Sequence, residues 1–215
     1  MPANRKSGSH ALTARGAATR SRIIEAAADL IYAQGVEGTS LDDVMVASGA
    51  SKSQLYHYFV DKDALVLEVI ALQAERVLAA QQPQLGALDS LRALKAWGKA
   101  IVRLNELVDM RGCPLGSLAN ELANTSESAR KRLDESFSMW RDRIETGLAK
   151  MQERGELAAS ADPHDLALAL LGAVEGGLLL AKTAQSGRPL EIALDMAIDH
   201  VARHMTARRG GAGRR

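Results

Sequence analysis

The sequence is poor in the residues that build disulfide-linked and β-sheet proteins. Its 215 residues include one cysteine, five prolines and seven aromatic residues, and charged residues make up 25% of the chain. The single Cys113 excludes an intrachain disulfide and is typical of a reducing cytoplasm. Scarce aromatics beside abundant alanine and leucine favour helices over sheets. The longest apolar stretch, residues 166–181, contains Glu175 and is too short for a membrane span. With no run of signal-peptide type, we expect a soluble, cytoplasmic, all-α protein.

Charge is distributed unevenly along a chain whose net charge is only +1. Residues 1–24 and 200–215 each contain five basic residues and no acid, so the segment between them is acidic. Residues 1–18 are expected to form a basic flexible arm. Such an arm either engages phosphate through counterion release or only keeps the protein soluble. The Gly/Arg-rich residues 208–215 are expected to be a disordered tail.

Apolar periodicity and capping residues predict about nine helices and no strands. The first helix is expected at 19–34, where Ile23, Ala27 and Ile31 form a stripe that Gly35 terminates. Later helices are expected to begin at Pro114, after Ser126, after Asp162 and at Pro189. The predicted domains are an N-terminal three-helix unit with a connecting helix at 19–79 and a helical domain at 80–207.

Residues 39–63 read as two short helices around a tight turn. Gly49 supplies the turn, and Ser51 is placed to cap the second helix three residues before Gln54. Leu55 and Phe59 are spaced to anchor that helix inward. Its outward positions then carry hydrogen-bond donors: Lys52, Ser53, Gln54, Tyr56 and His57. One buried face and one face rich in donors is what a DNA-binding helix-turn-helix requires.

The same stretch resembles the DNA-binding domain of the TetR family of bacterial regulators, specifically over residues 19–79. The residues that carry the resemblance are Ile23, Ala26, Ala27, Thr39, Ser40, Val44, Gly49, Ser51, Leu55, Tyr56, Tyr58, Phe59 and Lys62. Met45, Ser48, Ala50 and Ser53 depart from the usual pattern, and none of them removes a polar contact to DNA. The resemblance implies a homodimer that binds operator DNA and a C-terminal domain that binds an effector.

The candidate DNA contacts fall into two groups. Gln54, Tyr56 and His57 are expected to reach base edges or the adjacent backbone. Ser40, Ser51, Lys52, Tyr58 and Lys62 are expected to position phosphates, and the resemblance supports Tyr56, Tyr58 and Lys62 most. Thr19 and Arg20, at the expected start of the first helix, are candidates for capping a phosphate.

The helix after Pro163 is apolar nearly all round and must be covered on several sides. Rows of small residues on it allow another helix to approach closely. The resemblance implies that this helix and the last one form a four-helix dimer interface, and burial within one chain is the alternative. The expected interface residues are Leu170, Gly172, Gly176, Leu194, Ile198 and Val201.

The expected effector pocket is lined by Trp97, Met110, Cys113, Phe137, Trp140 and Glu175. Packing alone is the alternative for each aromatic side chain. Apolar walls favour an apolar or aromatic effector. Glu175 on so apolar a helix requires a partner, either within the chain or on a ligand. Cys113 would occupy the helix N-cap before Pro114, where the dipole favours a thiolate, or it would be a small apolar filler.

These observations predict a ligand-responsive transcriptional repressor that uses no cofactor and is not an enzyme. No catalytic set of residues is apparent, and His200 and His204, four residues apart, are a weak metal candidate beside a role at the helix dipole. One alternative is a repressor that senses redox agents or electrophiles through Cys113. A remote alternative is a helical enzyme or adaptor that does not use its DNA-binding unit.

Overall fold

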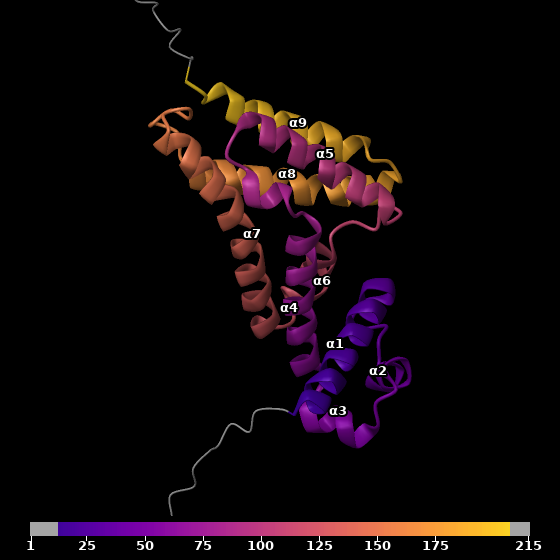
Figure 1. Cartoon of the computed structure of the whole chain (residues 1–215). Helices are drawn as coiled ribbons and strands as arrows, with labels where there is room; N and C mark the ends of the chain where they lie inside the picture. The colour runs from indigo at the N-terminus through magenta and orange to yellow at the C-terminus, as the bar shows by residue number, and fades with distance from the viewer. Residues whose placement is uncertain (1–12, 207–215) are drawn as a thin grey trace, which may run out of the picture. The chain divides into compact units, whose positions relative to one another are not determined.

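The computed structural model describes residues 13–206, and all its regular structure is helical. Within these residues it contains nine α-helices and one 3₁₀ helix, and the only β contact is an isolated bridge between Leu157 and Met205. The expectation of an all-α protein with nine helices is confirmed. In Figure 1 the helices are α1 (Ala14–Gln34), α2 (Leu41–Ser48), α3 (Lys52–Tyr58), α4 (Lys62–Ala80), α5 (Leu91–Leu107), α6 (Pro114–Leu122), α7 (Glu127–Glu153), α8 (Pro163–Ala184) and α9 (Arg188–Arg203), with η1 (Gln84–Ala87) between α4 and α5.

Helix starts follow the caps in the sequence. Ser126 accepts a hydrogen bond from the Ala129 amide at the start of α7, and Asp162 accepts one from the His164 amide at α8. Pro114 is the first residue of α6, where its missing N–H costs no hydrogen bond. The Ser126 and Asp162 side chains thus satisfy amides that the helix itself leaves unpaired.

The first helix begins five residues earlier than the sequence predicts. Thr13 is its N-cap and accepts a hydrogen bond from the Gly16 amide at 3.1 Å. Residues 14–18 are therefore helical, and the prediction that they belong to a flexible arm is wrong. Three of these five residues are alanines, which have the highest intrinsic helix propensity. The remainder of the arm and the tail at 208–215 lie outside the described residues.

The chain divides into two compact units, one ending at Leu72 and the other beginning at Gln73, so the division falls within α4. In the first unit, α1 packs against α2 and α3. Its core contains Ile23, Ala27, Val44, Leu55 and Phe59, each at most 2% exposed. This small core fixes the face that α3 turns outward.

In the second unit, α8 packs against both α7 and α9, and α9 also packs against α5 (Figure 1). Close approach of α8 and α9 depends on Gly177, since a Cβ atom there would lie 2.9 Å from the Cα atom of Leu190. Among the described residues α8 is the one helix with the length and composition of a membrane span. The core helix of a globular domain has the same properties, and eight residues of α8 are buried in the domain.

Candidate nucleic-acid interface and ligand pocket

Helix α3 is held inward by two apolar side chains and turns its donors outward. Leu55 is fully buried and Phe59, which follows the helix, is 2% exposed. The predicted capping box is confirmed: Ser51 accepts a hydrogen bond from the Gln54 amide at 3.3 Å, and the Gln54 Oε1 atom accepts one from the Ser51 amide at 2.9 Å. All five outward positions predicted from the sequence are exposed: Lys52, Ser53, Gln54, Tyr56 and His57.

The exposed face of α3 combines a cation with aromatic rings. The Lys52 ammonium lies 6.0 Å from the centroid of the Tyr56 ring, which is 47% exposed. The His57 and Tyr58 rings meet edge to face at 4.9 Å, and Tyr58 is half-buried. Such a face offers donors to phosphates and base edges and carries no carboxylate between Lys52 and Tyr58.

Like Ser51, two further expected phosphate contacts, Ser40 and Lys62, have local structural partners. Ser40 and Asp43 form a capping box at α2, in which the Ser40 hydroxyl donates to the Asp43 Oδ2 atom at 2.6 Å. This hydrogen bond lowers the pKa of Asp43, so a phosphate at Ser40 would meet a carboxylate. The Lys62 ammonium donates to the Val36 carbonyl at 2.5 Å, tying the start of α4 to the loop after α1.

The expectation for Thr19 is corrected. Because α1 begins at Ala14, Thr19 lies in the second turn, where it is buried and its hydroxyl donates to the Arg15 carbonyl. It therefore offers no helix-end site for a phosphate. Arg20 forms a 2.7 Å ion pair with Glu68 and lies 5.6 Å from the centroid of the Phe59 ring, so it braces α1 against α4 and α3.

The second unit contains a pocket of about 330 Å³ that brings together three of the six predicted lining residues: Cys113, Phe137 and Glu175. Sequence reasoning missed its other polar walls, which include Ser117 and Asn120 on α6 and Lys182 on α8. The signal for α6 was available, because Cys113, Gly116, Ser117 and Asn120 recur at helical spacing.

The other three predicted lining residues do not border this pocket. Trp97 is fully buried and its indole Nε1 atom donates to the Gln81 Oε1 atom at 2.9 Å. Trp140 is 2% exposed within α7, and Met110 is half-buried in the loop after α5. Both tryptophans therefore pack in the core. This was the alternative interpretation of these residues in the sequence.

Burial shifts the pKa of two titratable groups on the pocket wall, Glu175 and Cys113. It raises the pKa of Glu175, whose Oε1 atom is enclosed and has no hydrogen-bond partner. Burial, and then the charge of Glu175, raise the pKa of the Cys113 thiol well above its ordinary value. Cys113 does occupy the N-cap of α6, but the expected bias toward a thiolate is wrong because burial and the carboxylate outweigh the helix dipole.

The expected dimer interface also requires correction. Leu170, Leu194, Ile198 and Val201 are at most 2% exposed inside their own chain, so they hold α8 and α9 to their own domain. Gly172 and Gly176 do face open space. The apolar side chains exposed on these two helices are Leu168, Leu179, Leu180, Ile192 and Met196. A partner would meet this second set.

Comparison with known proteins matches both units to family models. Residues 23–69 match the model described as bacterial regulatory proteins, tetR family. Residues 87–197 match the model described as tetracyclin repressor-like, C-terminal domain. The two matches together include α2, α3 and α5–α8 in full.

Similar whole chains have the same organisation. An uncharacterized HTH-type transcriptional regulator in the lacX 3′ region of Lactococcus lactis is 30% identical over 83% of this chain and 90% of its own length. The HTH-type transcriptional regulator LmrA of Bacillus subtilis is 28% identical over 80% of this chain and 90% of its own. A TetR transcriptional regulator from Chloroflexus aurantiacus has a crystal structure that matches 90% of this chain and 98% of its own with a TM-score of 0.76 and 25% identity.

Proposed function

Because this chain belongs to the TetR family of transcriptional regulators, we propose that it is a homodimeric, cytoplasmic repressor released from a pseudo-palindromic operator by a small effector. We assign it no catalytic role. The main support for the proposal is the outward face of α3. Five exposed side chains that can donate hydrogen bonds lie there at consecutive or nearly consecutive positions, on a helix whose other face is buried. Helices of this kind place their first residues against base edges in the major groove.

The exposed apolar face of α8 and α9 supports the dimer. It combines five large side chains with the open surface at Gly172 and Gly176. Large apolar patches on a protein surface mark interaction sites, and small residues let two helices approach closely. Two identical faces would form an isologous contact and give each operator half-site one reading helix.

The pocket beside Glu175 supports an apolar or aromatic effector that carries a hydrogen-bond donor or a cationic group. Phe137, Leu178 and Leu179 provide apolar walls, while the enclosed Oε1 atom of Glu175 lacks a partner. A buried polar atom without a hydrogen bond costs free energy that a ligand donor would recover. The effector would release DNA only to the extent that its affinities for the two states of the repressor differ.

Fluorescence anisotropy of a labelled operator tests this proposal. Aromatic amines, their neutral analogues and their carboxylate analogues are titrated against the wild-type complex and the Glu175→Gln complex. We expect the amines to release wild-type DNA at the lowest concentrations and to lose most of that advantage against the variant. Release by carboxylates alone would contradict the effector class, and the absence of any operator complex would contradict the regulator itself.

A second candidate, a repressor switched by modification of Cys113, depends on a reactive thiolate. The raised pKa and burial of that thiol favour the reversible pocket over the cysteine switch.

A further inference from the structure

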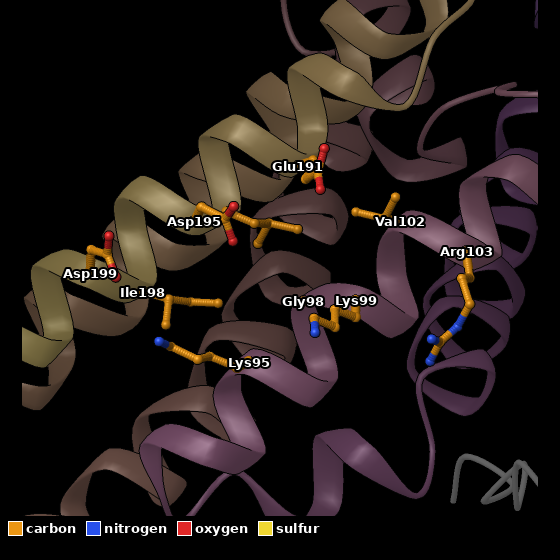
Figure 2. A pocket seen from close by; sticks show the side chains of 10 residues that line it. Lys95, Gly98, Lys99, Val102, Arg103, Glu191, Asp195, Ile198 and Asp199 are labelled. Atoms are coloured by element: carbon orange, nitrogen blue, oxygen red, sulfur yellow. The ribbon is translucent and has the colours of Figure 1, made fainter.

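A charged groove of about 590 Å³ lies between α5 and α9, apart from the effector pocket (Figure 2). One rim is basic and belongs to α5, with Lys95, Lys99 and Arg103 at every fourth residue. The other rim is acidic and belongs to α9, with Glu191, Asp195 and Asp199 at the same spacing. All six side chains are exposed. Gly98, Leu194 and Ile198 are the buried residues among the groove's lining.

The two helices run antiparallel, which sets the register of the rims. A Cβ atom at Gly98 would meet the Ile198 Cδ1 atom at 3.1 Å, and one at Gly187, just before α9, would meet the Glu106 Oε1 atom at 3.1 Å. The start of α9 therefore lies beside the end of α5. At a rise of about 1.5 Å per residue, charges four residues apart repeat every ~6 Å along both rims.

The rims do not neutralise each other within the described chain. No ion pair within 4.0 Å joins them, and only Glu191 is paired, with Arg188 on its own helix at 2.8 Å. Five of the six charges are therefore available to a partner. Three cations in a row beside three anions in a row, at equal spacing, form a surface that is complementary to itself.

We propose that this α5–α9 face binds the same face of a second copy of the chain, in addition to the apolar contact through α8 and α9. A two-fold axis parallel to the helices places the basic rim of each copy over the acidic rim of the other and keeps the antiparallel register. The two-fold axis across the helices sets like charges together and is disfavoured. Charge thus selects one of the two symmetric arrangements.

The proposed association is weak and depends on salt. Exposed ion pairs each contribute little, so the face assembles only at high local concentration, as between repressors on neighbouring operators. Its charges are screened at ~1 M salt, where the Debye length is about 3 Å. The apolar contact through α8 and α9 persists there, which separates the two kinds of association.

Sedimentation velocity of the full chain tests the proposal at micromolar to millimolar concentration, in low salt and at ~1 M salt. One variant carries Lys95→Glu and Lys99→Glu, and its matched counterpart carries Asp195→Lys and Asp199→Lys. Both spare the Arg188–Glu191 pair. Circular dichroism and thermal unfolding verify that each variant is folded.

We expect wild type to form, in low salt, a species larger than the one present at ~1 M salt. Each variant alone should lack that species, and a one-to-one mixture of the two should restore it, because a face with five acidic side chains and Arg103 then meets a face with five basic side chains and Glu191. A single mass for wild type at all concentrations would overturn the proposal. A mixture that stays at the mass of its components would also overturn it. That result is expected if the groove binds a zwitterionic small molecule, or if its two rims form ion pairs with each other.

Discussion

The carboxyl group of Glu175 on α8 packs against Gly116 on α6, so closely that a Cβ atom at residue 116 would lie 2.5 Å from the Glu175 Oε2 atom. Gly116→Ala should therefore displace the carboxylate while leaving the domain folded, because the end of a glutamate side chain can move. We expect a weaker response to effector at nearly unchanged stability, measured by operator release and thermal unfolding. Gly172→Ala is the matched control. It meets nothing within 4 Å and should gain about 0.5–1 kcal/mol with a normal response.

The charge of Glu175 helps to keep the Cys113 thiol protonated. Because the pKa of Cys113 is raised, its thiolate should form only at a higher pH than that of a free cysteine, and its alkylation at the same pH should be slower. Glu175→Gln removes the charge and should lower this pKa, so the alkylation rate should rise. Mass spectrometry over a pH series measures both rates. Equal rates in wild type and variant would mean that the carboxylate does not act on the thiol.

The buried hydrogen bond between Trp97 and Gln81 should matter for stability alone. Trp97→Phe leaves the Gln81 Oε1 atom without its donor and should cost about 1–3 kcal/mol, more if the smaller ring leaves a cavity. Denaturant unfolding measures this loss. At temperatures where the variant is folded, the effector concentration that releases DNA should be the same as for wild type. A different concentration would indicate that Trp97 lines the effector pocket.

The sequence predicts the starts of most helices well, because capping depends on neighbouring residues. Ser51 with Gln54, and Cys113 with Pro114, are local signals that the structure reproduces. Periodicity also identifies which residues point inward. It does not identify what covers them, since Ile198 was expected to meet a partner subunit and instead packs against Gly98 of its own α5.

The same limit explains the pocket. Phe137 and Trp140 have similar apolar character and lie on the same helix, yet only Phe137 borders the cavity. Glu175 was identifiable because a carboxylate on an apolar helix requires a partner wherever the helix packs. The charges of the α5 and α9 rims are regular in the sequence, but their juxtaposition depends on a contact between distant helices.

The open surface at Gly172 predicts how the apolar interface can be blocked. A Cβ atom at residue 172 meets nothing within 4 Å in its own chain, so Gly172→Leu should fold normally while the larger side chain holds a partner helix away. Light scattering at high salt should report a loss of dimer, and operator affinity should fall with it. Gly172→Ala should remain dimeric. An unchanged dimer mass for the leucine variant would place the interface elsewhere.

The central claim is that α3 reads a specific DNA sequence, and selection of genomic fragments by the purified protein tests it most directly. We expect wild type to enrich one pseudo-palindromic sequence at moderate salt. Gln54→Glu keeps the capping acceptor but removes the amide donor and adds a negative charge, so it should lose about 1–3 kcal/mol or more of operator binding with unchanged stability. Enrichment of no sequence by wild type, or the same enrichment by Gln54→Glu and Tyr56→Phe as by wild type, would contradict the account.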